Sequence, residues 1–239
     1  MRTALLTAVL FGVAGGDEKD DLKKALEKTA AAKSYFSQWS DEIALMGNNR
    51  PVSGAGEFVA PDLVTFRTGI TDIVKKGDKA MCKAKDGWVK AEEDRRNKAL
   101  AASLKPAHEE ARSILEKIEE PKKGKEAEVA KVKYRVVSGT LSGDALKEVA
   151  KAGRPNFGTL ANAIDWKSSK SGVDVLIDKK TGRLFRIAMA GDLKLVPLPI
   201  GGGRSETVAY KHSLEFLQYD EAKPSIDPEV KKALGIEQE

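Results

Sequence analysis

Few residues of this 239-residue chain have the types and spacings that catalysis needs. It contains two histidines, His108 and His212, and a single cysteine, Cys82. The histidines are far apart, and neither has a neighbour at the spacing of metal ligands. We therefore expect no histidine-based metal site and no serine–histidine–aspartate triad. Cys82 cannot form an internal disulfide, and we interpret it as a small apolar strand residue.

Two groups of neighbouring acids could act as general acid and general base. Asp41 and Glu42 lie in a predicted strand, where adjacent side chains point to opposite faces. Residues 92–94, Glu-Glu-Asp, open a predicted helix, where acidic residues offset the helix dipole. Residues 201–204, Gly-Gly-Gly-Arg, precede a strand and lack the Lys-Ser/Thr of a phosphate loop, which favours a flexible loop. We predict no catalytic residues, no metal and no cofactor.

The net charge is +5, from 41 basic and 36 acidic residues, and the excess is mild and spread along the chain. Nucleic-acid binders usually concentrate their basic residues on one face, so we expect no nucleic-acid partner. Weak attraction to an anionic membrane surface is more plausible. The lysine-rich stretches are interpreted as a solvated face or as a surface that docks on anionic lipid heads: Lys75, Lys76, Lys83, Lys85, Lys122, Lys123 and Lys125.

Residues 1–16 have the order of a secretory signal peptide. A single basic residue, Arg2, precedes the uncharged run 4–14, ALLTAVLFGVA, and small residues follow up to Gly16. The alternative is a buried N-terminal helix. The VAGG sequence resembles a lipoprotein cleavage box with Gly16 in place of the lipidated cysteine, so we predict no lipid anchor. We expect a periplasmic or secreted protein after cleavage, with residues 17–239 forming one domain.

Residues 20–33 predict a helix, because apolar residues recur at three- and four-residue spacing. From residue 34 to residue 90 the period changes to two, and short Gly-Asp and Asp-Gly turns predict an antiparallel meander. Residues 92–120 are predicted to be helical again, with Pro106 kinking the helix or starting a second one. Residues 121–128 are expected to form a loop.

The second half of the chain predicts further strands and one more short helix. The expected elements are a strand at 129–137, a helix at 144–152, a hairpin at 173–187, a long loop at 187–207 and a last strand at 207–218. A large sheet with one apolar face curls, and the helices cover that face. The fold class is therefore predicted as α+β, a curled antiparallel half-barrel of about nine to eleven strands covered by two or three helices.

Five segments in this order resemble the bacterial lipoprotein-carrier superfamily of LolA-, LppX- and LprG-like proteins. They are ALEKTAAAKSY (25–35), GAGEFVAPDLVTFRT (54–68), IVKKGDKAMCKAKDGWVK (73–90), VDVLIDKKTGRLFRI (173–187) and LEFLQYD with PSIDP (214–228). This chain differs from the family pattern at Met81 and Cys82, where family members usually have an aromatic residue, and in the long charged segment 92–128. It implies lipid binding without catalysis.

The leading functional hypothesis is an exported, non-enzymatic carrier that binds a lipid or the acyl chains of a lipoprotein in a hydrophobic cavity. Burial of each methylene in such a cavity contributes ~0.8 kcal/mol. The candidate cavity-lining residues are Leu22, Leu26, Tyr35, Trp39, Phe58, Phe66, Trp88, Tyr134, Ile177, Phe185 and Phe216. The alternative is an envelope sensory or protein-interaction module that uses the same fold with a closed cavity.

Overall fold

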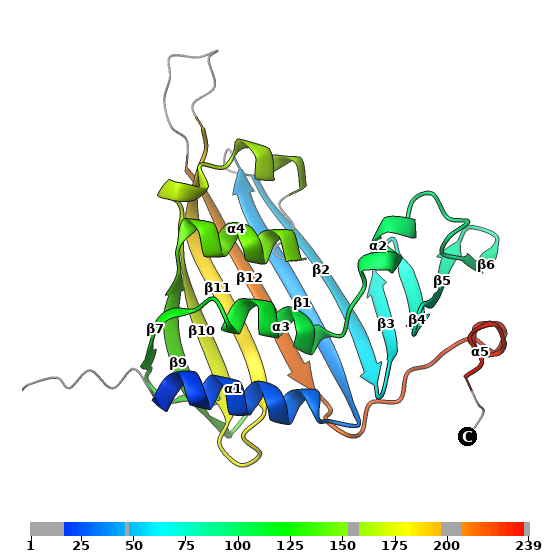
Figure 1. Cartoon of the computed structure of the whole chain (residues 1–239), viewed down its shortest axis with the longest axis horizontal. Helices are drawn as coiled ribbons and strands as arrows, with labels where there is room; N and C mark the ends of the chain where they lie inside the picture. The colour runs from blue at the N-terminus through cyan, green and yellow to red at the C-terminus, as the bar shows by residue number, and fades with distance from the viewer. Residues whose placement is uncertain (1–16, 46–47, 153–157, 197–206, 237–239) are drawn as a thin grey trace, which may run out of the picture.

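The computed structural model describes residues 17–45, 48–152, 158–196 and 207–236. The predicted signal peptide, residues 1–16, and the glycine-rich residues 201–204 lie outside the described residues. Within the described part, one antiparallel sheet of twelve strands dominates the molecule. The sheet curls without closing, as Figure 1 shows. The predicted α+β half-barrel is confirmed, but the described residues form twelve strands where about nine to eleven were expected and five α-helices where two or three were expected.

The chain enters the middle of the sheet and builds one half first. The strands of that half are β1 (Ser34–Leu45), β2 (Asn48–Val59), β3 (Leu63–Thr68), β4 (Asp72–Lys76), β5 (Lys79–Ala84) and β6 (Gly87–Lys90). They follow one another across the sheet as the predicted meander. Short turns make this possible, since antiparallel neighbours need only a few connecting residues.

The other half of the sheet comes from the second part of the chain. Its strands are β7 (Glu119–Lys123), β8 (Ala127–Val129), β9 (Val132–Leu141), β10 (Lys170–Asp178), β11 (Leu184–Lys194) and β12 (Thr207–Leu217). The last strand, β12, pairs with β1 in the centre, so residues at opposite ends of the chain face each other, for example Trp39 and Leu214. This pairing joins the two halves into one sheet.

Three helices cover one face of the β1–β12–β11–β10 region: α1 (Asp17–Ala30), α3 (Ala107–Leu115) and α4 (Gly143–Ala152). Figure 1 shows them lying across these strands. The apolar stripe predicted for the first helix is confirmed, because Leu22, Ala25, Leu26 and Thr29 are all buried. We call this side of the sheet the helix face.

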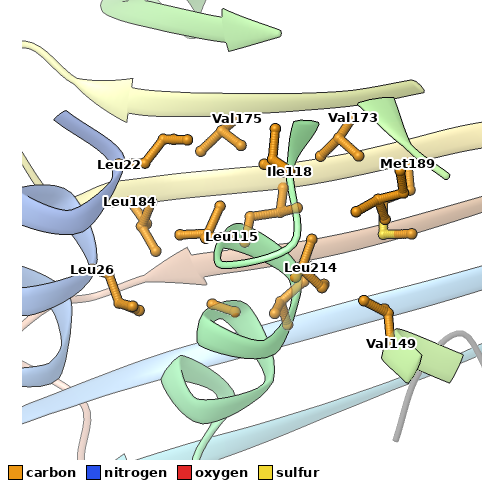
Figure 2. Packing of buried hydrophobic residues seen from close by; sticks show 14 of the residues in the cluster. Leu22, Leu26, Leu115, Ile118, Val149, Val173, Val175, Leu184, Met189 and Leu214 are labelled. Atoms are coloured by element: carbon orange, nitrogen blue, oxygen red, sulfur yellow. The ribbon is translucent and has the colours of Figure 1, made fainter. Parts of the chain in front are cut away.

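The helix face of this region is densely filled. In Figure 2, Leu22 and Leu26 of α1, Leu115 of α3 and Val149 of α4 meet strand side chains such as Leu184 and Leu214. Interdigitated packing of this kind leaves few voids large enough for a ligand. Any space for a ligand on the helix face must therefore lie outside this cluster.

Two more helices pack at the β3–β6 end of the sheet. Helix α2 (Lys98–Ser103) lies on the helix face, where Ala101 packs with Phe66 and Ile73. Helix α5 (Pro228–Leu234) packs its residues Val230 and Leu234 on Leu63, Val74 and Met81, which alternate with the helix-face residues and so point to the opposite face. This end of the sheet is thus covered on both sides.

Two predicted loops are wrong. Residues 121–128, expected as a loop, contribute to the strands β7 and β8, which pair with β9. Their many charges fit the edge of the sheet, where one side of a strand faces water. Residues 187–194, expected as the start of a long loop, continue β11, because Ile187, Met189 and Leu193 alternate into the core.

Candidate functional site

A pocket of about 190 Å³ lies between the helix face of β1, β2 and β3 and the segment that forms α2 and α3. We call it the β1–β3 pocket. It lies at the edge of the filled core and shares Tyr35, Phe58, Val64 and Leu214 with it. Its lining residues come from six strands and helices and from their connections: Tyr35, Ser37, Trp39, Ala55, Gly56, Glu57, Phe58, Val64, Thr65, Phe66, Leu100, Ser103, Leu104, Lys105, Ala107, Glu109, Glu110, Ser113 and Leu214.

The wall formed by the sheet is largely aromatic. The alternation of β1 places Tyr35, Ser37 and Trp39 on the same face. The Tyr35 ring lies 5.1 Å from the Phe58 ring, and the Trp39 ring stacks on Phe66 at 6.1 Å with an interplanar angle of 12°. These paired rings give a flat apolar wall against which an apolar ligand could pack.

Two glycines allow this wall to form. A Cβ added at Gly54 would lie 2.6 Å from the Trp39 indole, and one added at Gly56 would lie 2.2 Å from the Thr65 carbonyl oxygen. Only glycine lets the backbone approach its neighbours this closely. The GAG sequence at residues 54–56 therefore sets both the position of the indole and the spacing of β2 and β3.

The opposite wall is formed by α2, α3 and the connection between them. Leu100, Leu104 and Ala107 contribute its apolar surface. Pro106 immediately precedes α3, as predicted for a proline that starts a second helix. The Lys75 ammonium group donates hydrogen bonds to the Ala102 carbonyl at 3.2 Å and the Leu104 carbonyl at 2.9 Å, which ties the connection to β4.

Charged residues accompany this wall. Lys105 and Glu109 form an ion pair at 3.5 Å, and both side chains are exposed. Such a pair contributes little to stability because water screens it. The pocket thus combines an aromatic wall with a charged and solvated border.

Tyr35 and His108 form a buried polar contact beside the pocket. The Tyr35 hydroxyl accepts the His108 backbone N–H at 3.1 Å and lies 2.9 Å from His108 Nδ1. With that N–H as its donor, the hydroxyl is free to donate its own proton to Nδ1, which requires the neutral Nε2–H form of the ring. Burial lowers the pKa of His108 and raises the pKa of Tyr35 far above its ordinary value. Both groups are therefore neutral near pH 7.

A second buried histidine lies on the same face. His212 Nδ1 lies 2.7 Å from Asp41 Oδ1, and the two residues are direct partners across β1 and β12. On the other side of the ring, His212 Nε2 lies 3.8 Å from Glu110 Oε1 of α3. Glu42, in contrast, pairs with Lys211 at 3.4 Å, so Asp41 and Glu42 face opposite sides as predicted. The imidazole of His212 has no contact with solvent and is out of reach of a dissolved substrate.

The eleven candidate cavity residues fall into three groups. Tyr35, Trp39, Phe58 and Phe66 meet in the β1–β3 pocket. Leu22, Leu26, Ile177 and Phe216 lie in the filled core. Trp88, Tyr134 and Phe185 do not line the pocket: Trp88 packs near α5, and Tyr134 stacks on Phe185 at 4.4 Å.

The physical reason for the third group is strand alternation. Tyr134 and Phe185 cluster with Val136 and Leu176, whereas Val175 and Ile177, the neighbours of Leu176, belong to the helix-face core. The cluster therefore lies on the face opposite the helices. The alternation itself follows from the residue pattern, but the choice of the face that the helices cover does not.

The site also contains residues outside the eleven candidates. Leu100, Leu104 and Ala107 line the pocket. In the sequence they were indicated by the helical spacing of apolar residues in the segment that follows the meander. The glycines at positions 54 and 56 had no chemical signature, because their role depends on the close approach of Trp39 and Thr65.

No protein-family model matches the chain. A search of curated proteins found no match. Among solved structures, the chain is similar to the lipoprotein LppX of Mycobacterium tuberculosis, with 14% identity, a TM-score of 0.49, and coverage of 88% of this chain and 98% of that one.

Two further structures are similar to the chain. LprF of Mycobacterium bovis has 9% identity and a TM-score of 0.47, with 89% and 97% coverage of this chain and that one. A LolA superfamily protein of Nitrosomonas europaea has 10% identity and a TM-score of 0.30, with 90% and 96% coverage. At these identities and scores the function has to be argued from the chain's own geometry.

Within the described ranges, no three or more histidine, cysteine, aspartate or glutamate side chains gather to hold a metal ion. None of the described helices combines the length and apolarity needed to cross a bilayer.

Proposed function

We propose that this protein is an exported, non-enzymatic carrier that binds an acyl chain in the β1–β3 pocket. The observation that carries the proposal is a pocket with an aromatic wall of Tyr35, Trp39, Phe58 and Phe66 and a largely polar opposite side, at the edge of a core that is otherwise filled. Ligand pockets are typically apolar and aromatic, with a few polar groups at their border. The ligand would be a lipid or an acylated protein.

The volume of the pocket limits what the closed structure accommodates. At about 190 Å³ it slightly exceeds the size of an engineered apolar cavity, ~150 Å³, that binds benzene. A segment of roughly six carbons fits, and its burial contributes about 5 kcal/mol at ~0.8 kcal/mol per methylene. A longer acyl chain requires one wall to move.

The wall best suited to move is α2 with the connection at residues 104–106. Helix α2 is only six residues long, and Asn97 at its start makes no capping hydrogen bond through its side chain. Isolated helices of this length are unstable without tertiary contacts. The two hydrogen bonds from Lys75 and the packing of Ala101 hold it in place. Their displacement would lengthen the pocket along β3 and β4.

Lipid extraction of protein purified after export, followed by mass spectrometry, tests the proposal directly. We expect a co-purified amphiphile. Uptake of a dansyl-labelled fatty acid by delipidated protein, measured by fluorescence, is the second measurement. A protein that co-purifies with no amphiphile and takes up no labelled fatty acid would not be a carrier.

The filled core under α1, α3 and α4 favours the alternative function, an envelope sensory or protein-interaction module. In that case the β1–β3 pocket stays closed and a partner protein binds elsewhere. Capture of a stable protein partner, together with a protein that binds no labelled fatty acid, would favour this alternative.

A further inference from the structure

One of the positively charged segments of the chain lies at the β3–β6 end of the sheet. Residues 75–98 contain nine basic and five acidic residues, a local excess of +4. The segment comprises the end of β4, then β5, β6 and the connection that leads to α2. The meander folds these residues into one end of the molecule (Figure 1).

An exposed apolar side chain lies within this charge. Ile70, in the turn between β3 and β4, has 80% of its surface exposed, the largest fraction among the large apolar side chains in the described ranges. It lines a surface groove together with Lys83, Lys85, Arg95 and Arg96, and we call these five residues the cationic tip. The acidic Glu93 and Asp94 line the same groove, so the basic residues exceed the acidic ones there by two.

The backbone that carries the cationic tip is well fixed. The Asp94 carboxylate accepts the Arg96 backbone N–H at 2.8 Å and the Asn97 side-chain N–H at 2.9 Å. The hydrogen bond to Asn97 lowers the pKa of Asp94, which stays ionised. Thr71, next to Ile70, lies 3.3 Å from the Asn97 side-chain oxygen and joins the turn to the same network.

The four basic side chains remain available to a partner. All four are exposed, and none forms a salt bridge within the part of the chain that the structure describes. An exposed apolar residue beside exposed cations that form no salt bridge fits a surface that is anionic outside and apolar just beneath. An anionic phospholipid bilayer has this structure.

We infer that the cationic tip docks the protein on an anionic phospholipid bilayer, with Ile70 inserted among the headgroups. The inference rests on the proposed carrier function, since a carrier must meet the membrane that donates or receives its lipid. The network at Asn97 leads directly into α2, the wall of the β1–β3 pocket. Docking therefore brings the pocket wall to the bilayer surface.

Vesicle flotation tests the inference, with full-length protein and vesicles of phosphatidylglycerol and phosphatidylcholine or of phosphatidylcholine alone. The test variant K83Q/K85Q/R95Q removes three charges from the tip and keeps Arg96 and Asp94. Each basic residue near an anionic surface contributes about fivefold to partitioning, so we expect binding to anionic vesicles to fall about 100-fold. Ile70→Ser should lower it about tenfold.

The matched control is K122Q/K123Q/K125Q, which removes the same charge from the β7–β8 end of the sheet. Its binding should stay much closer to that of the unchanged protein. The unchanged protein and the two triple variants are identical at all other positions. Any contribution to vesicle binding from the rest of the chain is therefore the same in all three. Equal loss in test and control variants, or equal binding of the unchanged protein to neutral and anionic vesicles, would overturn the inference.

Uptake of the dansyl-labelled fatty acid separates this inference from the proposed function. Neither set of glutamines lines the β1–β3 pocket, so both variants should take up the probe as the unchanged protein does. Vesicle binding through the tip without probe uptake would leave docking intact and remove the carrier function. Probe uptake without vesicle binding would remove docking alone.

Discussion

The Tyr35 hydroxyl joins the first central strand to the first turn of the pocket wall, through the His108 backbone N–H at 3.1 Å and Nδ1 at 2.9 Å. Tyr35 is fully buried and His108 nearly so. The contact spans two parts of the chain that the central sheet and its covering helix α3 bring together. It fixes where α3 begins on the sheet, and hence where the β1–β3 pocket ends.

Tyr35→Phe should lower the free energy of unfolding by about 2 kcal/mol, because it leaves a buried donor and a buried acceptor of His108 unsatisfied. Urea unfolding followed by circular dichroism measures the change. Tyr134→Phe is the matched control, since the Tyr134 hydroxyl has no hydrogen bond to the residues that the structure describes. A control that loses as much stability would contradict the assignment.

The stability of the protein should fall as the pH drops below about 6.5, the ordinary pKa of histidine. Burial lowers the pKa of His108, so the unfolded state binds its proton more readily than the folded state. The stabilisation is present above the unfolded pKa and is lost as the pH falls through that value toward the folded one. Urea unfolding between pH 5 and pH 8 measures this slope.

His108→Gln separates this titration from the others. The variant should be less stable at pH 7 and should show a shallower dependence of stability on pH in this range. Carboxylates whose pKa is lowered by ion pairs, such as Asp220 beside Arg183, act only at lower pH. An unchanged slope in His108→Gln would assign the titration to another group.

Ala107→Phe should weaken uptake of the dansyl-labelled fatty acid at least tenfold, because its benzyl group fills space in a pocket of about 190 Å³. Ala99→Phe is the matched control: Ala99 is exposed on α2 and does not line the pocket. Its uptake should stay within about twofold of the unchanged protein's. Equal weakening in both variants would place the ligand outside the pocket.

Gly56→Ala should destabilise the protein by about 2 kcal/mol, because its Cβ would lie 2.2 Å from the Thr65 carbonyl oxygen and would push β2 from β3. Gly69→Ala should change the free energy of unfolding little, since nothing lies within 4 Å of the position that its Cβ would take. Thermal unfolding of both variants measures the difference. A Gly56→Ala protein as stable as Gly69→Ala would show that the two strands can separate at no cost.

The elements of this fold were largely predictable from local patterns. The helix expected at 20–33 is α1 (Asp17–Ala30), and Pro106 precedes α3 as expected. The failures were at residues 121–128, most of which belong to β7 and β8, at residues 187–194 of β11, and at the two ends of the helical segment predicted over 92–120. Residues 121–128 are highly charged and lack the apolar alternation by which a strand is recognised in sequence. They form edge strands because they pair with β9.

The pocket was less predictable than the elements. Tyr35, Trp39, Phe58 and Phe66 could be named from their alternation in strands, but so could Tyr134 and Phe185. The two sets have the same signal in sequence, because a strand has two faces and its pattern does not say which one the helices cover.

The sequence by itself determined that the chain would form a curled antiparallel sheet with amphipathic helices packed on it, because periods of two and of 3.6 residues are local properties of the chain. Only the tertiary structure decided where space remains on the helix face. The pairing of β1 with β12 and the close approach at Gly54 and Gly56 join residues distant in sequence, and the packing of three helices fills the rest. Free volume is what remains after all these contacts have formed, so no single segment encodes it.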